Sequence, residues 1–168
     1  MSVLAAPFDI GLTGVEPGNI IRMKMAAVKI YRGGAVGVII GTGYATPMVI
    51  ATSGMKFVGI ALETVDNSAG SAGDLWIRVQ FKGLAAFNNG NTLTVAHVGK
   101  MVYFVSGTDD NSVTDTAGNI PAGELKTVDS NGVLWVEIGV ATNGVLFYNT
   151  TDQKIYAQGY GIKSAAMS

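Results

Sequence analysis

The strongest constraint on the fold is a repeat within the chain. The segment GIALETVD (residues 59–66) resembles AGELKTVD (residues 122–129). Each is followed by an alternating segment that begins Leu-Trp, namely LWIRV (residues 75–79) and LWVEI (residues 134–138). Each copy therefore reads as a β-hairpin, and a single hairpin is only marginally stable in water. We expect the two copies to pack about a pseudo-two-fold axis, each covering the apolar face of the other.

Both segments that begin Leu-Trp alternate with a period of two, so each predicts a strand with one core face and one wetter face. The predicted core faces hold Leu75, Ile77, Val79 and Phe81 in the first copy, and Leu134, Val136, Ile138 and Val140 in the second. Further strands are predicted at residues 21–25, 35–40, 47–50, 56–62, 101–105, 145–148 and 154–158. Turn dipeptides separate them, and one of these, Asn131-Gly132, is a strong signal for a hairpin turn.

This pattern predicts an all-β protein, a sandwich or small barrel of short antiparallel strands that contains a duplicated hairpin module. We divide it into three parts. Residues 1–27 are an N-terminal arm or first strand, residues 28–140 are a β core with hairpin modules at about 55–82 and 101–140, and residues 141–168 are a C-terminal hairpin extension. Residues 20–31 mix strand alternation with helix-favouring Met and Ala, and we expect strand there.

The composition excludes several classes of site. There is no cysteine, which excludes disulfides, thiolate metal sites and cysteine nucleophiles. Eleven basic residues balance twelve acidic ones without a basic stripe, so neither nucleic acid nor a membrane surface is an expected partner. The uncharged stretch at residues 33–55 is broken by glycines and predicts strand, turn, strand instead of a membrane helix. Only 14% of residues are charged, which favours burial of surface against partners or other copies.

No motif in the sequence assembles a catalytic or metal site. The glycine-rich stretch at residues 33–43 lacks the lysine of a phosphate-binding loop. His97 is the only histidine, and we interpret it as a loop or interface residue. The acidic segment at residues 108–115 places Asp109 and Asn111 at calcium-loop spacing but lacks the following glycine, so we interpret it as an exposed hairpin tip. We expect no enzyme activity, no cofactor and no metal.

Three aspects of the repeat concern its polar positions. Asp66 and Asp129 stand where turns begin and are predicted to cap them. Trp76 and Trp135 occupy equivalent places on the polar faces of their strands, where a tryptophan marks a protein interface or a sugar platform, or lies under a loop. The neighbours Arg78 and Glu137 would form a cross-strand ion pair if the two Leu-Trp strands were adjacent.

The order of motifs across residues 56–140 resembles the small β-rich capsid decoration (cement) proteins of tailed bacteriophages. The segments that carry the resemblance are FVGIALETVD, LWIRVQFKGLAAF, VGKMVYFVSG, VTDTAGNIPAGEL and LWVEIGV. The resemblance implies a non-enzymatic virion protein, made in the cytoplasm of a bacterial host and located on the capsid surface. Its implied partners are the major capsid protein and further copies of itself in a homotrimer. Its implied role is to stabilise the capsid against the pressure of packaged DNA.

Five residues are candidates for contact with the capsid or another subunit. Phe8, Ile10 and Leu12 alternate in the N-terminal segment, which is either an arm added to the sheet edge of a partner or the first strand of this domain. Trp76 and Trp135 are the other two. The alternative functions are another β-rich virion component, such as a head fibre base or tail protein, and a carbohydrate-binding module that uses the two tryptophans.

Overall fold

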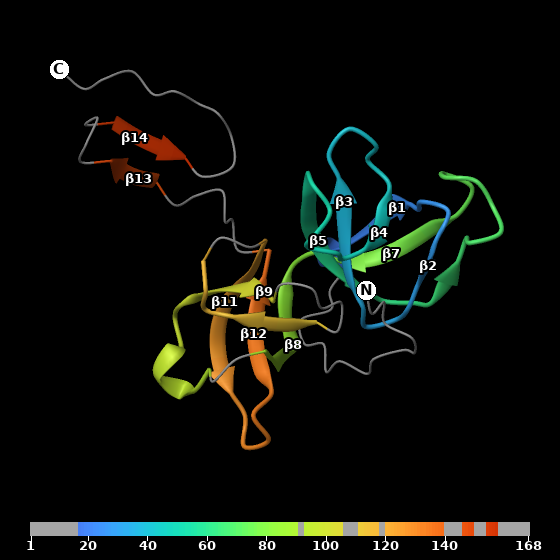
Figure 1. The fold of residues 1–168 in the computed structure, drawn as a ribbon. Helices are drawn as coiled ribbons and strands as arrows, with labels where there is room; N and C mark the ends of the chain where they lie inside the picture. The colour runs from blue at the N-terminus through green and yellow to red at the C-terminus, as the bar shows by residue number, and fades with distance from the viewer. Residues whose placement is uncertain are drawn as a thin grey trace.

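The structure is a computed structural model that describes residues 17–90, 93–105, 111–117, 120–139, 146–149 and 154–157. The predicted all-β class is confirmed. The described residues form fourteen strands and two short 3-10 helices, η1 (Pro17–Asn19) and η2 (Val95–His97), and no α-helix. Among strands β1 to β12, Figure 1 shows two groups, one on each side of the connection between β7 and β8.

The first sheet contains five antiparallel strands in the spatial order β1-β7-β5-β3-β4. They are β1 (Ile20–Lys24), β3 (Ala35–Ile39), β4 (Ala45–Pro47), β5 (Met55–Ala61) and β7 (Trp76–Gln80). A parallel bridge joins Met25 to Ala45, and Ala26 N–H donates to the Ala45 carbonyl at 2.9 Å. Because this bridge links the chain after β1 to the opposite edge strand β4, the first sheet curls towards closure.

The barrel is a closed sheet of five strands in the order β10-β8-β12-β11-β9. They are β8 (Gly83–Asn89), β9 (Met101–Phe104), β10 (Ser112–Thr114), β11 (Pro121–Val128) and β12 (Leu134–Ile138). The contact between β10 and β8 is parallel, and the other pairs are antiparallel.

Two further pairs of strands complete the described structure. The short strands β2 (Lys29–Ile30) and β6 (Val65–Asp66) form an antiparallel ribbon. At the C-terminal end, β13 (Leu146–Asn149) and β14 (Lys154–Ala157) pair as an antiparallel hairpin.

The first sheet and the barrel share one topology. In chain order, strands β1, β3, β4, β5 and β7 have the same neighbours as β8, β9, β10, β11 and β12, respectively. The one parallel contact also falls at the same place, between β1 and β4 in the first sheet and between β8 and β10 in the barrel. The repeat seen in the sequence is therefore the best-preserved part of a duplication that covers residues 20–80 and 83–138. Each copy of the repeated phrase forms the predicted antiparallel hairpin, β5–β7 or β11–β12.

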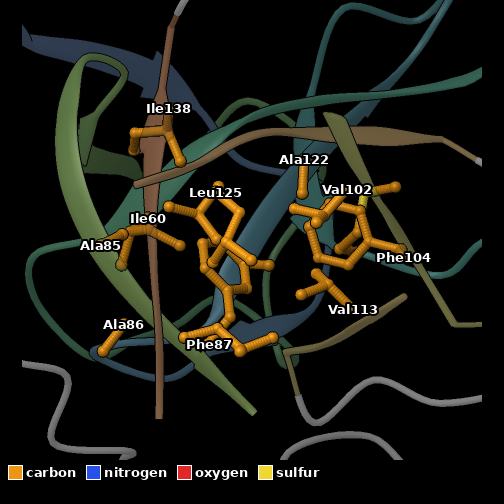
Figure 2. Close-up of a cluster of buried hydrophobic side chains, with 14 of the residues drawn as sticks. Ile60, Ala85, Ala86, Phe87, Val102, Phe104, Val113, Ala122, Leu125 and Ile138 are labelled. Atoms are coloured by element: carbon orange, nitrogen blue, oxygen red, sulfur yellow. The ribbon is translucent and has the colours of Figure 1, made fainter. Parts of the chain in front are cut away.

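Two apolar cores hold the molecule together. The larger one fills the barrel and extends to one face of the first sheet, where it includes Met48, Met55 and Ile60. Figure 2 shows Ile60 among the side chains of the barrel. Phe57 of β5 meets Phe87 and Phe104 of the barrel edge to face, with ring centroids 6.4 and 5.0 Å away. The smaller core lies on the opposite face of the first sheet and contains Met25, Ile30, Val36, Ala45, Ala61, Ile77 and Val79.

The expectation that each hairpin covers the apolar face of the other is wrong for the Leu-Trp strands. Ile77 and Val79 belong to the smaller core, whereas the equivalent Val136 and Ile138 lie in the barrel. Each apolar face is therefore enclosed by its own curled sheet. The two units, the first sheet and the barrel, meet instead through the outer face of the first sheet. This face covers the barrel core beside β5.

Several local predictions need correction. The strand predicted at residues 47–50 is β4, which ends at Pro47, and β8 and β10 were not predicted. Leu75 is 41% exposed because it precedes β7, whereas Gln80 is fully buried because the barrel covers the sheet there, opposite Ile60. The aspartate caps are confirmed: Asp66 accepts from Ser68 N–H, and Asp129 accepts from the N–H groups at residues 131 and 133.

Asn111 ties the two units together, contrary to the exposed hairpin tip expected for it. The side chain is buried, with Oδ1 accepting from Ala35 N–H at 2.9 Å and Nδ2 donating to the Gly33 carbonyl at 2.7 Å. Its backbone lies in the left-handed region with φ of 58°, a conformation that asparagine tolerates better than most residues. Asp109, the other residue of the proposed calcium spacing, lies outside the described residues.

We predict that Asn111→Ala lowers the free energy of unfolding by about 2–4 kcal/mol, because it orphans two buried backbone groups and strains the left-handed backbone. Asn111→Gly is the matched variant, since it keeps the backbone conformation and removes only the hydrogen bonds. Urea unfolding should place it between wild type and Asn111→Ala. Wild-type stability of Asn111→Ala would contradict the assigned role.

Candidate functional site

Trp76, at the start of β7, is the largest of the exposed apolar side chains in the described part of the chain. Trp76 is 46% exposed and follows the exposed Leu75. Large aromatic side chains that stay exposed on a rigid strand are typical anchors of protein interfaces. Trp76 begins β7 one residue after the Ser71–Asp74 turn, in which Ser71 N–H donates to the Asp74 carboxylate at 2.7 Å.

Strand register places three cations beside this tryptophan. Lys24 of β1 lies directly opposite Trp76, and Arg22 lies directly opposite Arg78. Since opposite residues and residues two apart along a strand share a face, all four side chains lie on one face of the sheet. The Arg22 guanidinium carbon and Lys24 Nζ lie 5.6 and 5.5 Å from the Trp76 ring centroid, within cation–π range. We call Arg22, Lys24, Trp76 and Arg78 the basic-aromatic face.

One carboxylate, Glu63, borders this face. Arg78 donates to it twice, from Nη2 to Oε2 at 3.2 Å and from its backbone N–H to Oε1 at 3.0 Å. The side-chain hydrogen bond from Arg78 lowers the pKa of Glu63. Partial burial opposes that shift, and the backbone N–H of Arg78 and the charges of Arg78 and Arg22 reinforce it. Three cations against one carboxylate leave a local surplus of two positive charges.

The fold does not require these cations. At the equivalent positions of the barrel, Leu84 lies opposite Glu137 and Ala86 lies opposite Trp135. Like charges placed directly opposite one another on a sheet are destabilising, so the pairing of Arg22 with Arg78 works against folding. A second unit with the same topology folds without it, which favours a binding role for the basic-aromatic face.

The two tryptophans are equivalent in the repeat but differ in their surroundings. Trp135 is half-buried and packs against the larger core, whereas Trp76 is exposed. They belong to separate units, so the structure does not bring them together as one platform. For the same reason the cross-strand ion pair suggested for Arg78 and Glu137 is wrong: Glu137 pairs with Lys126 at 2.9 Å.

The remaining candidates at the N-terminus, Phe8, Ile10 and Leu12, lie outside the described residues. Sequence reasoning also missed Arg22 and Lys24 as partners of Trp76. Their alternation in IIRMK marks the polar face of β1, but which strand lies opposite is fixed only by the sheet order.

His97 lies at the end of η2, in the connection between β8 and β9, in keeping with a loop histidine. Thr94 N–H donates to His97 Nδ1 at 3.1 Å, so the neutral ring carries its proton on Nε2. His97 Nε2 and Lys100 Nζ each lie 3.7 Å from the same Asp115 oxygen. His97, Lys100 and Asp115 therefore form a surface cluster of polar side chains. The Nδ1 atom of His97 is already used to accept the hydrogen bond from Thr94 at the start of η2.

Two further features are absent from the part of the chain that the structure describes. Within this part of the chain, histidine, aspartate and glutamate side chains do not gather in any group of three that could hold a metal ion. The same residues contain no helix of the length and apolarity needed to span a membrane.

Comparison with known proteins found no match: no protein-family model, no curated protein and no solved structure matches the chain.

The lowered pKa of Glu63 gives a prediction with a definite sign. A carboxylate whose pKa is lower in the folded than in the unfolded protein stabilises the fold above the unfolded value, near 4.5, and loses that effect as the pH falls through the folded value. At pH 7, Glu63→Gln should lower the free energy of unfolding by roughly 0.5–1 kcal/mol, as expected for a partly exposed ion pair. The difference from wild type should be smaller at pH 4 than at pH 7, and it should vanish once the Glu63 carboxyl is protonated in the folded protein. An equal difference at both pH values, measured by urea unfolding, would contradict the ion-pair assignment.

Proposed function

We propose that this protein is a structural virion protein that binds the outer surface of a phage capsid and stabilises it against the pressure of packaged DNA. The observation that carries the proposal is the basic-aromatic face, an exposed tryptophan held among cations on a hydrogen-bonded sheet. The motif order across residues 56–140, which resembles capsid decoration proteins, supplies the identity of the target.

The arrangement of polar side chains supports binding more than catalysis. Arg78 is held by Glu63, His97 is held by its helix cap and faces Asp115, and the buried Asn111 is used to join the two units. Each of these polar groups already has a hydrogen-bond or ion-pair partner within the protein. Trp76 and Leu75, by contrast, retain apolar surface that a partner could cover.

Attachment to a capsid makes modest contacts sufficient. A shell presents many identical sites, and linked copies of a binding protein gain avidity without new contacts. In this proposal the major capsid protein is the partner, and the protein binds it as a homotrimer. The alternating N-terminal residues Phe8, Ile10 and Leu12 would serve as an arm added to a neighbouring sheet.

A carbohydrate-binding module is the second candidate, because an exposed tryptophan is also a stacking platform for sugars. Two observations weigh against it. Arg22 and Lys24 both lie over the Trp76 ring, which reduces the free aromatic surface, and Trp135 is half-buried in the other unit.

The proposal predicts that Trp76→Ala weakens binding to undecorated capsids of the same phage by roughly 30-fold or more, the effect typical of an interface hot spot. It should also abolish the gain in heat resistance that the protein gives those capsids. Trp135→Phe is the matched control and should bind like wild type, since Trp135 packs against the larger core.

Occupancy is measured by co-sedimentation and the heat resistance by release of packaged DNA. Failure of the wild-type protein to occupy capsids would refute the proposed function. Full occupancy by the Trp76→Ala variant would refute the assignment of the binding face.

A further inference from the structure

We infer that the basic-aromatic face recognises an acidic, extended segment of a protein partner, with carboxylates placed on Arg22 and Lys24 and apolar contact made by Trp76. The inference rests on the proposed function, since it names the chemistry of the capsid segment that this face would bind. It is carried by charge, by spacing and by comparison with the barrel.

The charges of the face are only partly compensated from within the described chain. Arg78 is paired with Glu63 at 3.2 Å. In the described ranges, by contrast, neither Arg22 nor Lys24 has a carboxylate within ion-pair distance, and each instead lies over the Trp76 ring. Two cations on one face are therefore available to receive carboxylates from a partner.

The distribution of charge over the whole chain strengthens this argument. The net charge of the protein is −1, and the three cations with Glu63 sum to +2, so the remaining residues sum to −3. A positive face on an otherwise negative molecule orients an acidic partner towards this face during encounter.

The spacing of the cations suits an extended ligand. Arg22 and Lys24 are two residues apart on a strand, which separates them by about 6.6 Å along its axis. An extended peptide presents alternate side chains at the same interval, so acidic residues at positions i and i+2 match the two cations. On the side away from β7, the described chain meets β4 only through the Met25–Ala45 bridge after the end of β1, so no described strand pairs with residues 20–24 on that side.

The barrel provides an internal comparison for the same strand pair. Leu84 and Ala86 stand where the first sheet has Arg22 and Lys24, and Glu137 stands where it has Arg78. The same framework therefore holds either charge pattern, and the basic pattern is specific to the first sheet.

The test uses the Trp135→Phe protein, in which Trp76 is the only tryptophan and its fluorescence reports directly on the face. The probes are ten-residue peptides of alternating Glu and Thr, Gln and Thr, or Lys and Thr. We expect a saturable change in Trp76 emission with the Glu peptide alone, weakened at least tenfold when the salt concentration rises from 50 to 300 mM.

The double variant Arg22→Gln/Lys24→Gln in this background should weaken binding of the Glu peptide at least tenfold. Lys82→Gln/Lys100→Gln is the matched control, because it removes the same charge from positions outside the face. It should leave the affinity within twofold. In capsid co-sedimentation, the Arg22/Lys24 variant should lose occupancy while the Lys82/Lys100 variant keeps it.

The outcomes separate this inference from the proposed function. If the Glu peptide does not bind and the Arg22/Lys24 variant still decorates capsids, the inference is overturned and capsid binding stands. Binding of the Glu peptide by a protein that does not occupy capsids would support the inference and refute the proposed function. A fluorescence response to neutral oligosaccharides instead of the Glu peptide would overturn the inference. It would also be overturned if the double variant changed only in oligomeric state, as measured by light scattering.

Discussion

The contact between Phe57 and the two barrel phenylalanines, Phe87 and Phe104, is the interaction on which the rest of the structure depends. It lies in the larger core, where one face of the first sheet covers the interior of the barrel. The buried Asn111 side chain also joins the barrel to the first unit, through hydrogen bonds with the backbone of residues 33 and 35. Two small curled sheets are thereby joined into one body with a continuous core.

This packing also decides which surface is free. The outer face of the first sheet is covered at Gln80 and Ile60, where the barrel lies. It is uncovered two and four residues earlier along β7, at Arg78 and Trp76. The basic-aromatic face is the part of that surface that extends beyond the barrel. Its rigidity comes from the pairing of β1 with β7 and from the smaller core underneath.

Duplication explains how such a face could arise. The two units keep the same strand order and the same parallel contact, so the framework is held constant while the outward side chains differ. In the barrel, the positions opposite Trp135 and Glu137 are apolar, and Trp135 packs against the larger core. In the first sheet they are basic, and Trp76 is exposed. The strand order that the two units share belongs to the fold. The outward side chains in which they differ are the ones that we connect with binding.

The sequence predicted much of the fold because the period-two pattern is strong where one side of a strand is buried. It identified β7 and β12, the Asn131-Gly132 turn and both aspartate caps. It missed β8, whose sequence GLAAFNN is rich in residues that are rare in strands and is specified by the packing of the barrel. The division of the apolar faces between two cores and the cations around Trp76 depend on sheet order, which a local pattern cannot encode.

The most direct test of this account is native-state hydrogen exchange, because a shared core requires the two units to unfold together. The most protected amides of β7 in the first sheet and of β12 in the barrel should open with the same free energy, equal to that of global unfolding. Phe57→Ala should lower both values by the same amount. Opening of the first sheet at a lower free energy while the barrel keeps full protection would contradict the account.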